Sequence, residues 1–167
     1  MNLSEYRKSM WKFAVYPNSG SNPLYAELGL LSEIGELAGE AKRVIRDDEG
    51  VITSERKGNM ISELGDIMWY LSAISHERNS EDFLLSLDNI EDNSLDNFSG
   101  VNDFLTCINK LPTIFYSDKD ETREFYIMLK SLINYLETSL EVILQNNIDK
   151  LQSRMDRNKI KGSGGDR

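Results

Sequence analysis

The chain has 167 residues, a length typical of one domain with its own hydrophobic core. Its 28 acidic and 19 basic residues give a net charge of −9, which excludes the generally basic surface of proteins that bind duplex nucleic acid. The sequence shows no apolar signal segment or membrane-spanning run, and its single cysteine excludes an internal disulfide, so we expect a cytoplasmic protein with no membrane partner.

The first half of the chain reads as three helices. A short helix is predicted at about residues 3–13, with Ser4 as its N-cap, and the stretch 16–23, which contains proline and glycine, predicts a loop. Two longer helices are predicted at about 24–46 and 55–77, because apolar residues recur there at the spacing of one helical face. We expect these residues to be buried: Leu30, Ile34, Leu37, Ala41 and Val44 in one helix, and Met60, Leu64, Ile67, Leu71 and Ile74 in the other.

Three further helices are predicted after a polar, loop-like stretch at residues 79–98. They cover about 99–111, 120–136 and 139–155, and Pro112 is expected to end the first of them. No stretch alternates between apolar and polar residues as a strand would. The sequence therefore predicts an all-α fold built on a helix bundle.

One domain is expected over residues 1–160, and the glycine-rich residues 161–167 predict a flexible tail. The segment at about 79–125 is acidic and is predicted to be only partly helical. Within it, Cys107 lies among apolar neighbours and is expected to be a buried thiol.

A pattern of carboxylate, apolar residue, glycine, carboxylate and apolar residue occurs twice, starting at Glu33 and at Glu63. Residues three apart on a helix share a face, so Glu33 is expected beside Glu36 and Glu63 beside Asp66, at the edge of each apolar stripe. If the two helices pack together, the four carboxylates converge, and protons or divalent cations must offset their repulsion. Four oxygen ligands suit Mg²⁺ or Mn²⁺, and such sites usually handle phosphates.

These patterns also allow other interpretations. A single Glu-x-x-Glu pair on a helix usually belongs to a solvated face, and this alternative stays open for either pair alone. Gly35 and Gly65 each cost about 1 kcal/mol relative to alanine in a helix, and their matched positions indicate close backbone approach. A di-iron site needs Glu-x-x-His motifs, and the only histidine, His76, lies outside both patterns. One cysteine and one histidine also cannot close a typical zinc site.

Residues 25–43 and 63–71 resemble the MazG-type all-α nucleoside triphosphate pyrophosphohydrolases, whose hallmark is Glu-x-x-Glu, a spacer and Glu-x-x-Asp. Residues 147–154 read Asn-Ile-Asp-Lys-Leu-Gln-Ser-Arg and resemble the family's Asn-x-x-Lys-Leu-x-x-Arg. The resemblance covers about residues 20–78 and 137–160. The combination of motifs is specific, although each motif alone is weak.

The resemblance implies a reaction and a metal. A (deoxy)nucleoside triphosphate is split between its α and β phosphates, giving the monophosphate and pyrophosphate. Glu33, Glu36, Glu63 and Asp66 would be the catalytic residues and would hold two or three Mg²⁺ ions, for which Mn²⁺ can substitute. One carboxylate would be the general base, and Glu33 is favoured for this role.

The resemblance also implies substrate contacts. Lys150 and Arg154 would contact phosphates, and Asn147 would contact the sugar or a phosphate. Lys42 and Lys57 are further candidates for phosphate contacts. The alternative for all these basic residues is a solvated surface, and at a helix C-terminus they also suit the macrodipole.

The base is not determined by the sequence, although a purine deoxynucleotide such as dGTP is favoured, with control of dNTP pools as the expected role. Trp69 and Tyr70 are expected to be packing residues, and Trp11 and Tyr25 are the weaker candidates for a base pocket. Compact family members lack the acidic insertion at 79–125, which is expected to cover the site, tune base choice or form a subunit interface. A homodimer or homotetramer is expected.

Two other functional classes remain open at this point. One is a non-catalytic helical module that binds a nucleotide or regulates. The other is a structural interaction protein that acts through the acidic insertion.

Overall fold

The first helix begins at a capping box. In the computed structural model, α1 (Leu3–Met10) is preceded by Asn2, whose side chain accepts a hydrogen bond from the backbone of Glu5 at 2.9 Å. The Glu5 carboxylate in turn accepts from the backbone of Asn2 at 3.0 Å. The predicted cap, Ser4, is therefore wrong, because Asn2 already satisfies the free N–H groups of the first turn. A 3₁₀ turn at Trp11–Phe13 completes the predicted segment.

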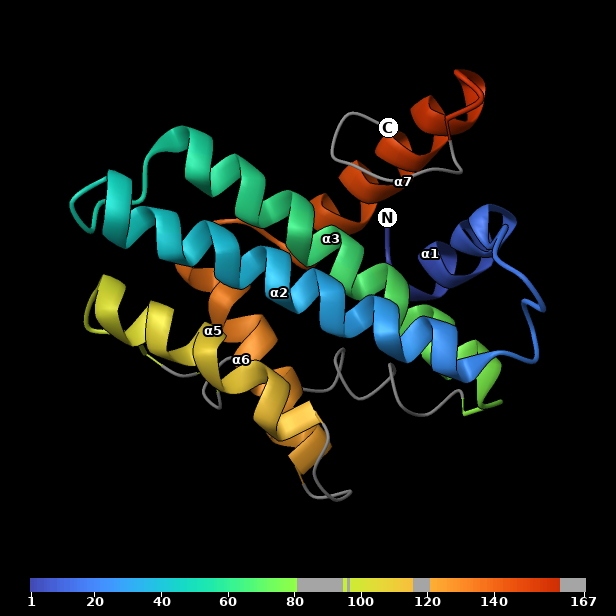
Figure 1. Ribbon diagram of the computed structural model, residues 1–167, viewed down its shortest axis with the longest axis horizontal. Coiled ribbons are helices and arrows are strands. Elements are labelled where there is room, and N and C mark those ends of the chain that lie inside the picture. The colour runs from blue at the N-terminus through green and yellow to red at the C-terminus, as the bar shows by residue number, and fades with distance from the viewer. Residues whose placement is uncertain (81–94, 96, 116–120, 160–167) are drawn as a thin grey trace.

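The two long helices start where local chemistry favours a helix N-terminus. Asn22 caps α2 (Pro23–Asp47), which has proline at its first position, where no N–H is needed. Thr53 caps α3 (Ser54–Glu77) by accepting a hydrogen bond from the backbone three residues on. The two helices run antiparallel and side by side through the molecule (Figure 1). Both agree with the predicted ranges to within a residue.

The second half of the chain forms α5 (Val101–Phe115), α6 (Glu121–Tyr135) and α7 (Leu140–Asp156). Pro112 lies inside α5 and does not end it, so that prediction is wrong. Proline removes one backbone donor and crowds the preceding turn. Four side chains before Pro112 are buried and hold the helix against its neighbours: Phe104, Cys107, Ile108 and Leu111.

The structure describes residues 1–80, 95, 97–115 and 121–159. Most of the predicted loop at 79–98 and the whole predicted tail at 161–167 lie outside these residues. Within them, every regular element is helical, which confirms the all-α prediction. No helix in this described part is long and apolar enough to cross a membrane.

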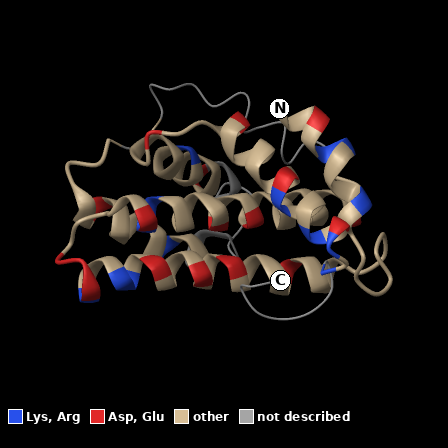
Figure 2. Cartoon of the chain, turned by 90° about the horizontal axis from the view of Figure 1, so that it is seen from above, with Lys and Arg blue, Asp and Glu red and all other residues tan. Residues whose placement is uncertain are grey.

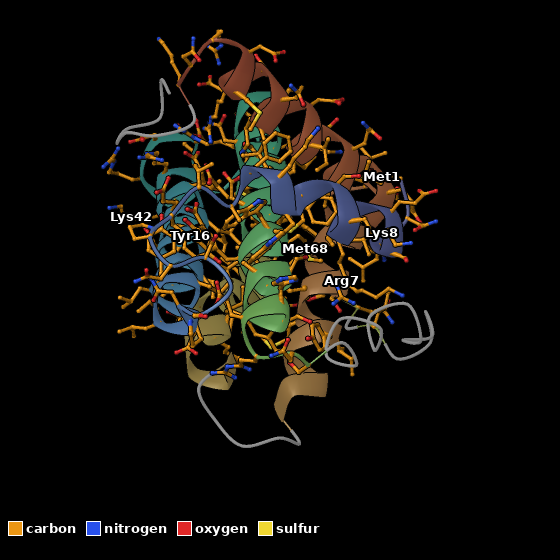
Figure 3. The ribbon with its side chains drawn as sticks, turned by 90° about the vertical axis from the view of Figure 1, so that its right-hand side faces the viewer. Met1, Arg7, Lys8, Tyr16, Lys42 and Met68 are labelled. Carbon is orange, nitrogen blue, oxygen red and sulfur yellow. The ribbon has the colours of Figure 1, made fainter. Side chains whose placement is uncertain are left out.

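The core forms around the pair α2 and α3. Helix α7 packs on α3 and also contacts α1, whereas α5 packs on α2 and against α6 (Figures 1 and 3). Helix α5, which belongs to the predicted insertion, therefore packs directly on α2. All ten residues of the two predicted stripes are buried, none being more than 6% exposed, and Cys107 is buried as well. This packing fixes the rotation of α2 and α3, and so the direction of their polar edges.

Glu77, the last residue of α3, ties that helix to the start of α2. Its carboxylate accepts hydrogen bonds from the Tyr16 hydroxyl at 2.5 Å, from the backbone of Gly20 at 2.8 Å and from the backbone of Asn22 at 2.6 Å. Burial opposes the charged form, but these hydrogen bonds outweigh it and hold the pKa of Glu77 below its ordinary value. The loop before α2 is therefore anchored by one buried carboxylate.

We expect Glu77→Gln to lower the free energy of unfolding at pH 7 by about 1–3 kcal/mol, because one acceptor becomes a donor that faces other donors. The lowered pKa means that the wild-type advantage is present above the ordinary glutamate pKa and is lost as the pH falls through the folded-state value. Urea unfolding at neutral and acid pH measures both effects. Glu55→Gln, an exposed change on the same helix, is the control. Equal stability of Glu77→Gln and wild type at pH 7 would contradict the anchor.

Candidate metal centre

The packing of α2 on α3 brings three of the four predicted carboxylates together. Glu33, Glu36 and Glu63 each offer an oxygen, and these three atoms lie within 4.8 Å of one another. We call these three residues the carboxylate cluster. Among the described residues, none of the three carboxylates has a hydrogen-bond or ion-pair partner. By contrast Glu40, next along the same edge of α2, is paired with Arg43 and Arg56.

Burial and mutual repulsion make the fully ionised form of the cluster unfavourable. Burial, followed by repulsion from Asp66, Glu36 and Glu63, raises the pKa of Glu33 from its ordinary 4.5 to about 8. Burial, followed by repulsion from Asp66 and Glu36, raises the pKa of Glu63 to about 7. Lys150 acts against both shifts without cancelling them. Protons therefore occupy part of the cluster at neutral pH, which is the behaviour expected of carboxylates that share a site.

Asp66, the fourth predicted carboxylate, lies beside the cluster but is already engaged. It accepts hydrogen bonds from the Lys150 ammonium at 2.6 Å and from the Asn147 amide at 2.8 Å. The other end of the buried Asn147 side chain accepts from the Tyr6 hydroxyl at 2.7 Å. Helix α7 thus delivers Lys150 to the edge of the cluster, where the Lys150 ammonium also contacts Ser62 at 3.0 Å.

Sequence reasoning did not identify Tyr6. A tyrosine at this position fits the apolar stripe of α1 and so attracts no attention. The available signal is a general one: a buried tyrosine hydroxyl needs a hydrogen-bond partner, which here is Asn147. Burial, followed by the charge of Asp66, raises the pKa of Tyr6, so its hydroxyl stays protonated and fixes the direction of the amide. In consequence the Asn147 nitrogen faces Asp66.

The two matched glycines have different surroundings. A Cβ atom on Gly65 would lie 3.2 Å from the Cβ of Asn147, so the close approach predicted there is made by α7. A Cβ atom on Gly35 would meet nothing within 4 Å in its own chain. Glycine at position 29 is explained by the ring of Tyr70, which an added Cβ would overlap. The ring therefore packs on the backbone of α2 one turn before Glu33.

The remaining predicted phosphate contacts are spread over the surface. Arg154 lies one turn after Lys150 on α7 and has no side-chain partner among the described residues. Lys57 is paired with Glu137 at 2.9 Å. Lys42 is exposed at the outer edge of the molecule (Figure 3), and at about 100° per residue it lies half a turn around α2 from Glu33. The described structure therefore gathers Lys150 near the cluster but neither Lys42 nor Lys57.

Aromatic side chains adjoin the cluster on the side of Tyr70. The exposed Tyr25 stacks on Tyr16, with ring centroids 4.4 Å apart, and Trp69 meets Tyr16 edge-on at 6.2 Å. Trp69 is buried, as predicted, but within the described residues its indole N–H has no hydrogen-bond partner. Trp11 instead stacks on His76 at 3.7 Å. Of the two predicted candidates for a base pocket, Tyr25 is the one linked to the site, because it interacts with Tyr70.

A small pocket of about 90 Å³ lies between α3 and α7, and Lys150 is part of its wall. Its polar lining comes from both helices, and the glycines of α3 leave the space open. Its walls are Gly58, Ile61, Ser62, Gly65, Ile143, Asn146, Asn147 and Lys150.

Comparison with known proteins shows a likeness over the full length of the chain. The Gene 37 protein of Mycobacterium phage L5 is 27% identical to this chain over 172 residues, and the match covers the full length of both proteins. No protein-family model matches the chain, and no solved structure matches it at a significant level. The likeness extends over the whole chain, and the name of the phage protein states no reaction.

Proposed function

We propose that this protein is a MazG-like all-α nucleoside triphosphate pyrophosphohydrolase, which cleaves a (deoxy)nucleoside triphosphate to the monophosphate and pyrophosphate. The carboxylate cluster carries this proposal. Three carboxylates converge from α2 and α3, with ligand atoms within 4.8 Å, and they have no basic partner of their own. A scaffold would gain nothing from this arrangement, since each carboxylate raises the free energy of the others.

The donor set fits Mg²⁺. It consists of oxygen atoms only, it is partly open to solvent at Glu36, and burial and mutual repulsion raise the pKa values of Glu33 and Glu63. Glu33, Glu36 and Glu63 would hold the metal. Asp66 would become a further ligand once its ion pair with Lys150 is broken. Bound Mg²⁺ would neutralise the triphosphate and make its α-phosphorus more open to attack.

The side chains of the protein have separate roles in this scheme. The oxygen of a water molecule bonds to the α-phosphorus, and the bond between the α-phosphorus and the bridging oxygen breaks to release pyrophosphate. Glu33, which the family resemblance favours for this role, is assigned as the base that accepts the proton of this water. Lys150 lies at the edge of the cluster and Arg154 one turn beyond it, where both would meet phosphate oxygens.

Tyr6 and Asn147 would position Asp66 rather than touch the substrate. Asn147 is buried, and both ends of its amide are engaged within the protein. Its proposed role therefore differs from the direct contact with sugar or phosphate that the resemblance implies. Tyr25 offers an exposed ring that interacts with Tyr70, and the ring of Tyr70 packs on α2 one turn before Glu33. We assign this side to the base and retain a purine deoxynucleotide such as dGTP as the favoured substrate.

A panel of common NTPs and dNTPs, incubated with Mg²⁺ or Mn²⁺ and resolved by chromatography, tests the proposal. The expected products are monophosphate and pyrophosphate from one or a few of them. Diphosphate and phosphate would place cleavage at the wrong bond and contradict the assignment. No turnover, with nucleotide binding retained by the folded protein, would favour the non-catalytic nucleotide-binding module instead.

A further inference from the structure

Lys150 and a bound metal ion would compete for Asp66. Both oxygens of this carboxylate are engaged, one by the Lys150 ammonium at 2.6 Å and the other by the Asn147 amide at 2.8 Å. A metal ion that took Asp66 as a ligand would have to displace the ammonium, because two cations at one carboxylate oxygen repel each other. The fourth predicted ligand is therefore closed to a metal by a cation of the protein itself.

The charge of Lys150 also acts on the carboxylate cluster. It acts to lower the pKa values of Glu33 and Glu63, as a bound metal ion would. Helix α2 does not bring such a charge to the cluster. Figure 2 shows acidic residues spaced along this helix, and its basic residues lie at its C-terminal end, at 42–46. The ammonium and a metal ion therefore offset the same repulsion, so each lessens what the other gains by binding.

Of the two members of this ion pair, Lys150 is the one that can move. Asp66 is held by Asn147, which is 2% exposed and accepts a hydrogen bond from the fully buried Tyr6. The Lys150 side chain is 24% exposed and carries its charge on a flexible four-carbon stem. Its other contact is with the uncharged hydroxyl of Ser62 at 3.0 Å. Separation of the pair would therefore leave Asp66 in place.

The pocket between α3 and α7 provides space for the displaced ammonium. Lys150 is part of its wall, and its volume of about 90 Å³ is enough for several water molecules. Ser62 and Asn146 supply uncharged oxygen atoms to the lining, and the exposed Asn146 side chain has no hydrogen-bond partner among the described residues. None of the residues that line the pocket is acidic. An ammonium that moved here would lose its carboxylate, so an anion must compensate for that loss.

We propose that Lys150 is a displaceable internal cation, which blocks Asp66 in the nucleotide-free protein and is drawn away by a phosphate group of the nucleotide, so that Asp66 can then bind the metal. This mechanism rests on the proposed function, because the anion that draws Lys150 away is the substrate of that reaction. Nucleotide and metal would bind cooperatively, and the coupling is reciprocal, since each raises the affinity of the other by the same factor. The metal would bind weakly until the substrate arrives.

Lys150→Met should tighten metal binding in the nucleotide-free protein. Mn²⁺ affinity is measured by electron paramagnetic resonance at pH 8.5, above the pKa values of about 8 for Glu33 and about 7 for Glu63, so that protons compete little. The affinity is expected to rise about ten-fold or more, because a charge-assisted hydrogen bond no longer opposes the metal. Lys57→Met is the matched control, since it removes an ammonium paired with Glu137 at 2.9 Å, and it should change nothing. Unchanged or weaker binding in a folded Lys150→Met variant would overturn the proposal.

A second variant and a double-mutant cycle show whether Asp66 is the group that Lys150 blocks. Lys150→Gln keeps a donor for Asp66 but loses the charge, so it should tighten Mn²⁺ binding less than Lys150→Met does. In the Asp66→Asn background, Lys150→Met should gain much less than in the wild-type background, because there is no carboxylate to release. Equal gains in the two backgrounds would indicate general charge repulsion and overturn the block at Asp66. Circular dichroism checks that each variant folds.

Sulfate, a divalent oxyanion that stands in for a phosphate group, tests the trigger. Compared with chloride at equal ionic strength, it is expected to tighten Mn²⁺ binding by wild type and to have no such effect on Lys150→Met. The same effect on both proteins would overturn the role of Lys150. None of these measurements needs turnover. Tightened Mn²⁺ binding without pyrophosphate release would contradict only the proposed reaction, whereas pyrophosphate release without tightening would contradict only the displacement of Lys150.

Discussion

Glu63→Gln is expected to abolish the magnesium-dependent release of pyrophosphate while the helical fold persists. The substitution keeps the size of the side chain but removes one of the three charges of the carboxylate cluster, and with it a ligand for a divalent cation. Residues that merely orient metal ligands commonly contribute 10- to 100-fold to activity, so losing a ligand should lower kcat/KM by at least about a hundred-fold. Colorimetric detection of pyrophosphate measures this directly.

Two further variants show whether such a loss is specific. Glu55→Gln makes the same chemical change on the same helix, at an exposed position eight residues before Glu63, and should keep full activity. Asp66→Asn removes the charge that Lys150 pairs with at 2.6 Å, and it too should be inactive. Binding of Mn²⁺, followed by electron paramagnetic resonance, should weaken in Glu63→Gln. Full activity in both Glu63→Gln and Asp66→Asn would exclude the cluster as the catalytic site.

Local signals were sufficient to predict most of the helical framework. Apolar spacing identified α2 and α3 and the face that each one buries, because burial of such a stripe is what fixes a helix in a folded protein. Two local predictions were wrong, the N-cap at Ser4 and the helix end at Pro112, because in each case a competing local interaction prevailed. Asn2 and Ser4 are both good N-caps, and only Asn2 has the matching glutamate three residues on. Pro112 marks a local penalty, but packing of the preceding turn outweighs it.

The candidate site was predicted only as far as repetition in the sequence allowed. The matched patterns at Glu33 and Glu63 identified the carboxylates, because two helices with the same offset present their acids to one another. The network from Tyr6 through Asn147 and Asp66 to Lys150 joins three helices that are distant in sequence. The positions of Lys57 and Lys42 relative to the cluster likewise depend on how α3 and α2 are rotated in the bundle. No spacing rule along one chain contains that information.

The same cluster should make the stability of the metal-free protein depend on pH in an unusual direction. Folding raises the pKa of Glu33 to about 8 and that of Glu63 to about 7, from 4.5 in each case. Between pH 4.5 and about pH 8 the folded protein holds more protons than the unfolded chain. The free energy of unfolding therefore decreases as the pH rises through this range. The contribution is fully present below pH 4.5 and is lost by about pH 8. With the metal chelated, Tm should therefore fall from pH 6 to pH 8.5.

Magnesium should reverse this trend, because a cation binds the deprotonated cluster and takes the place of its protons. Added Mg²⁺ is expected to raise Tm more at pH 8.5 than at pH 6, as scanning calorimetry would show. In Glu33→Gln the dependence of metal-free Tm on pH should flatten, with Tm at pH 8.5 above that of wild type, while the response to Mg²⁺ and the activity are lost. Stability gained together with activity lost is expected of a residue retained for binding a cation rather than for the fold. A metal-free Glu33→Gln variant less stable than wild type at pH 8.5 would instead assign Glu33 a structural role.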